Sequence, residues 1–168
     1  LWVSMKCVTD IIESGAVVDF DPDRVQIAMP DDFELPAGGL NIRWPDAVLD
    51  QEVRMNSYKW YAALAYVRAN KLNRIIWDSP KPKIGIITAG KSYLDTRQAL
   101  ADLGIDEQAA ADIGIRLYKI GMTWPLEADG VHEFAKGLDE ILVVEEKRQI
   151  IEYQLKEQLY NSPPASRA

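Results

Sequence analysis

Three strand-like runs alternate with three helical runs between residues 83 and 160, and this alternation constrains the fold more than any other feature of the chain. The periodicities predict strands at 83–88, 114–119 and 140–145 and helices at about 92–103, 130–137 and 147–160. Such alternation predicts a parallel sheet with right-handed crossovers and helices on both faces. The last helix should bury Ile151, Leu155 and Leu159 on one face and pair Glu152 with Lys156 on the solvent side.

The first strand leads into a literal match to the phosphate-binding pattern G-x-x-x-x-G-K-[ST], at residues 85–92. A phosphate loop needs a buried strand before its first glycine, but residues 79–83 are polar and twice interrupted by proline. The only apolar run available is therefore 84–88 itself, which puts Gly85 inside the strand. Ser92 and Asp95 then form a capping box for the next helix. We favour this structural interpretation and keep nucleotide binding as an alternative.

The composition indicates a single core and disfavours anionic partners. The 168 residues are 48% hydrophobic, enough for one full core. The 19 Lys and Arg against 26 Asp and Glu give a net charge of -7 with no basic stripe, which argues against nucleic acid or an anionic membrane surface as a partner. No apolar stretch approaches the roughly 20 residues that cross a bilayer.

Metal-binding residue types are scarce in the chain. The single cysteine, Cys7, excludes an internal disulfide and any iron–sulfur cluster held by this chain alone, and it fits a cytoplasmic location. The lone His132 lies beside Glu133 and is expected at the surface. We therefore expect no metal site.

The first 46 residues have less regular patterns. Residues 1–9 read as a strand that begins abruptly, as though cut from a longer polypeptide, and residues 24–28 read as a second short strand. Residues 29–46 contain three prolines and read as a connector that lies against another surface through Phe33, Leu35, Ile42 and Trp44. At the other end, residues 161–168 are expected to be a frayed tail.

Residues 50–73 form the longest helical pattern, and their aromatic side chains spread around more than one face. These aromatics are Tyr58, Trp60, Tyr61 and Tyr66. A helix that is apolar on several sides is usually packed on several sides. We expect a buried core helix, with docking of a partner as the alternative.

Several short motifs carry a family resemblance over nearly the whole chain. The run 114–127 followed by the apolar strand 141–146 resembles the C-terminal domain of transketolase-like thiamine enzymes. More specifically, the segments 38–46, 90–95, 124–127 and 144–148 resemble the long fused form of the indolepyruvate ferredoxin oxidoreductases. Four motifs in order are more specific than the phosphate-loop match.

The resemblance implies an α/β fold with three layers, α/β/α, and a mostly parallel mixed sheet of about five strands. One edge strand would be antiparallel, for which 25–28 is the candidate, and the fifth strand could lie beyond residue 168. The implied domains are the end of a pyrimidine-binding-type domain at 1–20, a connector with the long aromatic helix at 21–82, the transketolase C-terminal-like module at 83–161, and a flexible tail at 162–168.

The implied parent enzyme converts an aryl 2-oxoacid such as indolepyruvate to an acyl-CoA and carbon dioxide and reduces ferredoxin. Its cofactors would be thiamine diphosphate, magnesium and iron–sulfur clusters, with coenzyme A as co-substrate. This segment has no Gly-Asp-Gly motif, the nearest string being Ala128 to Gly130, so we expect it to bind none of these cofactors and to be inactive alone. Its partners would be the other domains of the parent and a second copy, with ferredoxin reached through the parent.

A ligand crevice is expected at the C-terminal ends of the parallel strands. Its candidate residues are Thr88, Gly90, Lys91, Gly121, Met122 and Glu145. A solvated Lys91 is favoured over one that holds an anion, such as part of coenzyme A. Ion pairs of Glu145 and Glu146 with Lys147, Arg148 or a partner are favoured over an acid–base pair. The remaining alternatives are a stand-alone nucleotide-binding module and a protein-interaction module.

Overall fold

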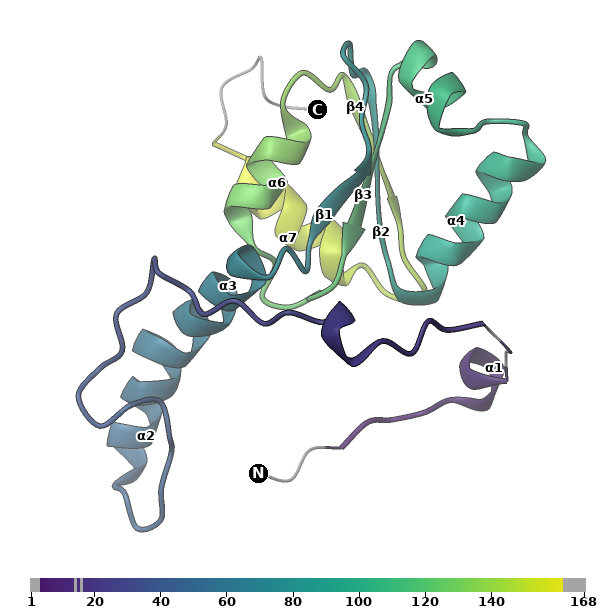
Figure 1. Cartoon of the computed structure of the whole chain (residues 1–168). Coiled ribbons are helices and arrows are strands. Elements are labelled where there is room, and N and C mark those ends of the chain that lie inside the picture. The colour runs from purple at the N-terminus through teal and green to yellow at the C-terminus, as the bar shows by residue number, and fades with distance from the viewer. Residues whose placement is uncertain (1–3, 14, 16, 162–168) are drawn as a thin grey trace.

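The computed structural model describes residues 4–13, 15 and 17–161, and its centre is a four-stranded sheet (Figure 1). The strands are Arg74–Trp77 (β1), Ile84–Ala89 (β2), Ile115–Ile120 (β3) and Glu140–Val144 (β4). They lie in the order β1-β3-β2-β4, with β2 parallel to both β3 and β4 and with β1 antiparallel to β3. The predicted α/β fold with a mixed, mostly parallel sheet is confirmed, and its described part has four strands rather than about five.

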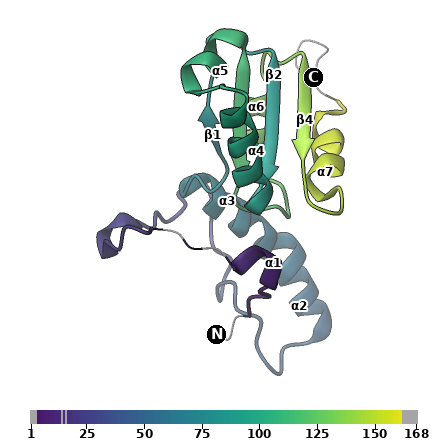
Figure 2. The ribbon, with the colours of Figure 1, turned by 90° about the vertical axis from the view of Figure 1, so that its right-hand side faces the viewer.

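Two pairs of helices cover the sheet, one pair on each face, and give the predicted three layers (Figures 1 and 2). The helices are Gly90–Asp102 (α4) and Glu107–Ile113 (α5) on one face, and Ala128–Ala135 (α6) and Ile150–Leu159 (α7) on the other. The face of α7 is as predicted, because Ile151, Leu155 and Leu159 are buried. Its solvent-side pair is also confirmed, with 2.5 Å between Lys156 Nζ and Glu152 Oε1.

The helix α5 was not predicted from the sequence. It has only seven residues, which is too short for an apolar period to stand out. Asp106 caps it, since the Asp106 carboxylate accepts a hydrogen bond from the backbone nitrogen of Ala109 at 2.9 Å. The following Gly114 ends it with a left-handed backbone, at φ +92°.

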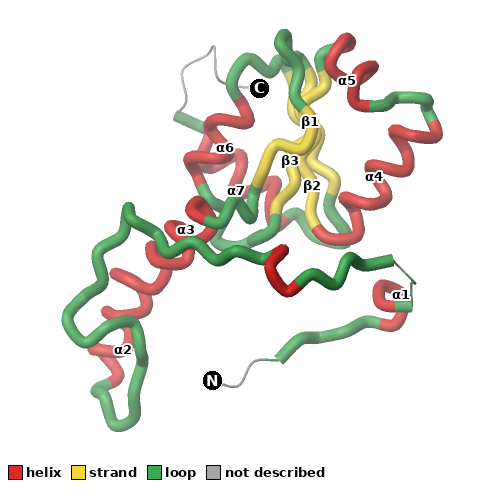
Figure 3. The backbone as a smooth tube through the Cα atoms, viewed as in Figure 1, coloured by secondary structure: helices red, strands yellow, loops and turns green. Residues whose placement is uncertain are grey.

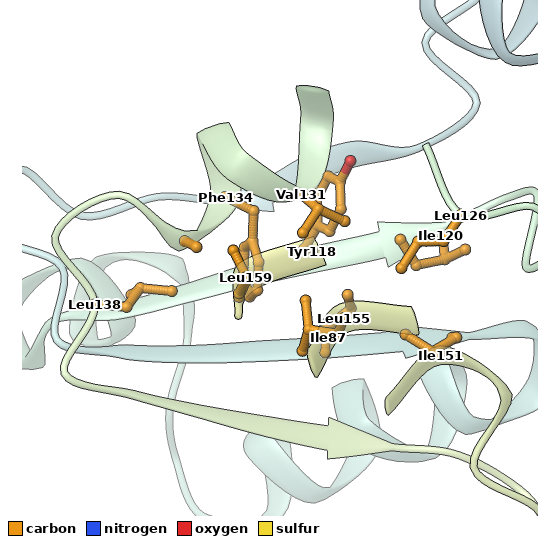
Figure 4. Packing of buried hydrophobic residues seen from close by; sticks show 11 residues of the cluster. Ile87, Tyr118, Ile120, Leu126, Val131, Phe134, Leu138, Ile151, Leu155 and Leu159 are labelled. Atoms are coloured by element: carbon orange, nitrogen blue, oxygen red, sulfur yellow. The ribbon is translucent and has the colours of Figure 1, made fainter. Parts of the chain in front are cut away.

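The larger of the two cores lies between the sheet and the pair α6 and α7 (Figure 4). Tyr118 of β3 and Phe134 of α6 stack there with ring centroids 5.0 Å apart. Gly85 lies inside β2, as predicted, and a Cβ at this position would come within 2.6 Å of Phe134 Cζ. The glycine therefore allows α6 to approach the sheet closely.

The antiparallel edge strand was predicted at 25–28 and is instead β1. Residues 25–28 form no strand, and Pro22–Arg24 is a short 3-10 turn. The backbone of Ala28 is satisfied by the side-chain amide of Asn70, which accepts from Ala28 N and donates to Ala28 O, both at 2.9 Å. This amide takes the place of a neighbouring strand, so the segment is extended without belonging to the sheet.

The prediction of a strand at 1–9 is also wrong for residues 4–9, the part of it that the structure describes. Residues 4–8 lie in no strand, and Thr9–Ile12 (α1) is a single helical turn. An isolated extended segment has no partner for its backbone groups, whereas a helical turn satisfies some of them internally. Residues 1–3 and the tail 162–168 lie outside the described part of the chain.

The long aromatic helix is present, but its residues are less buried than expected. It consists of Val48–Arg54 (α2), a π-helical turn at Met55–Lys59 and Trp60–Ala69 (α3), together called the helical arm. The arm projects away from the α/β layers (Figures 1 and 3), and only Ala65 and Val67 within it are buried. The interpretation as a core helix is therefore wrong, because few other elements lie alongside it.

The connector before the arm contacts less surface than predicted. Phe33 is half-buried, but Leu35 and Ile42 are exposed and Trp44 is 93% exposed.

None of the helices in the described part of the chain is long and apolar enough to cross a membrane.

Candidate functional site

A crevice of about 330 Å³ lies at the C-terminal ends of β2 and β4, where the chain turns into α4 and α7. Helices from these neighbouring strands go to opposite faces of the sheet, which is the position where open α/β sheets bind ligands. The lining residues come from the β2–α4 turn, the β3–α6 loop and the β4–α7 turn: Ala89, Gly90, Lys91, Ser92, Thr123, Glu145, Glu146, Arg148, Ile150 and Ile151.

The structure brings three of the predicted residues together in this crevice. Gly90, Lys91 and Glu145 line it, whereas Thr88 is fully buried in β2 and is not part of the lining. The β3–α6 loop contributes Thr123 to the lining. The predicted residues Gly121 and Met122 of the same loop are not part of it. Whether any of these residues contacts a ligand stays a prediction.

Lys91 makes a local ion pair. Its ammonium nitrogen lies 2.7 Å from both carboxylate oxygens of Asp95, one helical turn further on. The helix α4 begins at Gly90 and its N-cap is Ala89, so the prediction that Ser92 caps this helix is wrong. Gly90, at φ +55°, turns the chain directly from strand to helix and leaves no room for a separate capping residue.

Glu145 caps α7 instead of forming a salt bridge. Its carboxylate accepts hydrogen bonds from the backbone nitrogens of Ile150 at 3.0 Å, Ile151 at 2.7 Å and Glu152 at 3.0 Å. Free N–H groups at a helix start favour a negative charge, which explains why this carboxylate turns toward the backbone. The predicted ion pair with Lys147 is made by Glu146, at 3.7 Å.

A second polar site, not predicted from the sequence, lies where the helical arm meets the α/β layers. Glu127 is only 3% exposed and caps α6, accepting from the nitrogens of Asp129 at 3.0 Å and Gly130 at 2.7 Å. The same carboxylate accepts from Arg68 Nη1 at 3.2 Å, and Arg68 also lies 2.6 Å from a carboxylate oxygen of Asp32. Arg68 therefore joins the connector, the arm and α6.

Two groups at this site have shifted pKa values. Partial burial acts to lower the pKa of Arg68, but hydrogen bonds to Asp32 and Glu127 outweigh it, so the pKa is raised. Burial in the core raises the pKa of Tyr118 well above its ordinary value, and the charge of Glu127 raises it further. Tyr118 therefore stays a neutral phenol to a higher pH than an exposed tyrosine does.

Little in the sequence signals this second site. Glu127 is the N-cap of α6, but Glu is not among the residues usually preferred at N-caps, and the helix was expected to begin at about residue 130. The pairing with Arg68 could not be predicted either, because it depends on how the arm packs against the loop.

Residues 84–92 do not form a phosphate loop. Gly85 lies opposite Arg116 of β3 and Ile141 of β4 in the sheet, and the strand continues to Ala89. The nucleotide-binding alternative therefore has no support from these residues. In the described ranges, no three His, Cys, Asp or Glu side chains gather as a metal site would require, and His132 is exposed.

The sheet order, the layers and the crevice define an open three-layer α/β domain with one antiparallel edge. The family model of the indolepyruvate ferredoxin oxidoreductase middle domain matches residues 73–168, more than half of the chain. The chain belongs to this family, as the resemblance of its motifs implied.

Similar proteins include subunits IorA of indolepyruvate oxidoreductases. The chain is 36% identical over 74 residues to that of Pyrococcus horikoshii, a match that covers 44% of this chain and 10% of that protein. It is 34% identical over 83 residues to that of Methanothermobacter marburgensis, a match that covers 49% of this chain and 12% of that protein. The chain thus spans about a tenth of the length of these relatives.

A solved 2-oxoglutarate:ferredoxin oxidoreductase from Magnetococcus marinus, with 2-oxoglutarate, coenzyme A and succinyl-CoA bound, is a structural neighbour. Its TM-score is 0.47 at 15% identity, and the match covers 80% of this chain and 21% of the other.

Proposed function

We propose that this chain is a structural and assembly domain of a thiamine-dependent indolepyruvate ferredoxin oxidoreductase. The parent enzyme would oxidise an aryl 2-oxoacid to an acyl-CoA and carbon dioxide, with ferredoxin as electron acceptor, in the cytoplasm. The segment itself would be non-catalytic, and its partners would be the other domains of the parent and a second copy. The family membership and the IorA relatives support this proposal.

The observation that carries the proposal is the exposed apolar surface of the helical arm. Trp44, just before the arm, and Val48, Leu49 and Val53 within it are all largely exposed. An apolar group of this kind on a projecting element is typical of a contact surface, and exposed tryptophans are frequent anchors of such contacts. We infer that a neighbouring part of the assembled parent enzyme, a further domain or a second copy, covers it.

A second surface supports an assembly role. Leu142 of the edge strand β4 is 54% exposed, although parallel strands are usually covered on both faces. On the opposite face of β4 a groove of about 740 Å³ opens toward α7, lined in part by Ile141, Val143, Leu155 and Leu159. Both surfaces would be buried by neighbouring parts of the enzyme.

The described residues do not fit the cofactors of such an enzyme. Asp129, in the string nearest to a Gly-Asp-Gly motif, lies in the first turn of α6, and its carboxylate is 3.8 Å from Arg68. Cys7 is a single exposed thiol, whereas iron–sulfur clusters are usually held by four.

The domain division at residues 20, 82 and 161 belongs to the same proposal, with β1, which precedes residue 82, joined to the sheet of the α/β module. So do the candidate crevice contacts of Thr88, Gly90, Lys91 and Glu145.

The proposal is tested by removing the apolar surface in the full-length protein. The double variant Trp44→Ser and Leu49→Ser should reduce the assembled species in native mass spectrometry, while the circular dichroism spectrum stays unchanged. A matched control, Leu103→Ser, changes an equally exposed leucine beyond the end of α4. Assembly and indolepyruvate oxidation at the wild-type level in the double variant would contradict the proposal.

A further inference from the structure

The loop between β3 and α6, residues 121–127, is attached to the helical arm by two side-chain contacts. Trp124 and Trp60 of α3 meet edge to face, with ring centroids 4.3 Å apart and an interplanar angle of 82°. Glu127 and Arg68 form the ion pair at 3.2 Å. These contacts have different chemistry and hold the second half of the loop.

The first half of the loop is attached to the base of the arm. Asn73 Oδ1 accepts hydrogen bonds from the backbone nitrogens of Gly121 at 2.8 Å and Met122 at 3.1 Å. A Cβ at Gly121 would lie 2.5 Å from the carbonyl oxygen of Leu72, so the two backbones are in close contact. Both halves of the loop therefore contact the arm or the residues that directly follow it.

The same loop is attached on its other side to α7. Gln154, a buried residue, donates from Nε2 to the carbonyl oxygen of Thr123 at 2.9 Å and accepts from the nitrogen of Leu126 at 2.8 Å. Gln158 donates to the carbonyl oxygen of Leu126 at 2.8 Å. Thr123 is itself part of the crevice wall, and so is Ile150 at the start of α7.

We propose that the loop 121–127 couples the helical arm to the crevice. A displacement of the arm moves Trp124 and Glu127, and because Gln154 holds the same loop, the displacement reaches Thr123 and the first turn of α7. Packed interiors transmit such shifts because they have few voids that could absorb them. A partner that binds the arm would therefore change the crevice, whatever ligand the crevice takes, and the effect is reciprocal.

Hydrogen exchange in the full-length protein tests the coupling. In the variants Trp60→Ala and Arg68→Ala we expect the amides of 121–127 and of 145–154 to exchange about tenfold faster relative to those of β2. The control Tyr61→Ala removes a neighbouring aromatic that is largely exposed, and it should leave both segments unchanged. The conservative variant Arg68→Lys keeps a positive charge near Glu127 and should restore part of the protection.

Reciprocity provides a second test. Gln154→Ala removes two of the three hydrogen bonds named above between the loop and α7 and should accelerate exchange in α3. Faster exchange limited to the arm and the connector, with 145–154 unchanged relative to β2, would overturn the proposal. An equal increase in 121–127, 145–154 and β2 would also overturn it, because it would show general loosening without a specific path.

Discussion

Arg68 and Glu127 meet at 3.2 Å although 59 residues separate them in the sequence. The contact fixes the helical arm to the start of α6 and gives the buried carboxylate of Glu127 a positive partner. Buried charges are stable only when they are paired and hydrogen-bonded, and Glu127 meets both conditions through Arg68 and two backbone nitrogens.

Removing this carboxylate should destabilise the protein. Glu127→Ala loses the cap of α6 and one partner of Arg68, so we expect the free energy of unfolding to fall by about 1–3 kcal/mol. Urea denaturation measures it. The control Glu133→Ala removes an exposed carboxylate that pairs with Lys136 and should cost less than about 0.5 kcal/mol. Equal small losses in both variants would show that the buried contact contributes little.

Gly85 separates the strand interpretation from the phosphate-loop interpretation. Gly85→Ala places a methyl group against Phe134 and Leu138, and we expect a loss of about 1–3 kcal/mol in the free energy of unfolding. Gly15→Ala is the control, because a Cβ there meets no atom within 4 Å. Thermal unfolding of the two variants checks this, and an unchanged midpoint for Gly85→Ala would contradict the close packing of α6 on β2.

Glu145 should matter for stability through its cap of α7. Glu145→Ala leaves three backbone nitrogens without their acceptor and should cost about 1–2 kcal/mol in urea denaturation. Its neighbour Glu146 forms only a surface pair, so Glu146→Ala should change the free energy of unfolding by less than about 0.5 kcal/mol. The reverse order of the two losses would refute the capping role.

The alkaline stability of the protein should depend on Tyr118. Burial and the charge of Glu127 raise its pKa in the folded state above that in the unfolded state. The contribution of Tyr118 is therefore fully present below about pH 10, the unfolded value, and is lost as the pH rises above it. Ultraviolet titration should show a tyrosine that ionises only on unfolding, and this signal should be absent in Tyr118→Phe. Ionisation of Tyr118 before unfolding would contradict the prediction.

The central fold was predictable because its signals are local. Each parallel strand of the sheet is a short apolar run followed by a helical pattern, so their order and type could be inferred. The antiparallel strand was missed because Arg74–Trp77 has only four residues and comes directly after the long helix. Its identity as a strand depends on pairing with β3, more than 35 residues further along the chain, which no local pattern encodes.

For the candidate site, too, the local features could be predicted and the contacts between distant segments could not. Gly90, Lys91 and Glu145 could be placed in one crevice because parallel strands end at a common edge. The cap made by Glu145 depends on where α7 begins, and that boundary was predicted three residues too early. The exposure of the arm could not be inferred either, because an apolar helix has the same pattern whether its own domain or another one covers it.

The measurement that tests the central claim most directly is hydroxyl-radical footprinting of Trp44 in the full-length protein and in the isolated chain of residues 1–168. Trp44 is 93% exposed in the structure, so it should be oxidised readily in the isolated chain. If the arm is a contact surface within a larger enzyme, oxidation of Trp44 should fall about tenfold or more in the full-length protein, in line with the exclusion of water from the centre of an interface. Equal oxidation of Trp44 in the two proteins would contradict the proposal that this domain assembles through its helical arm.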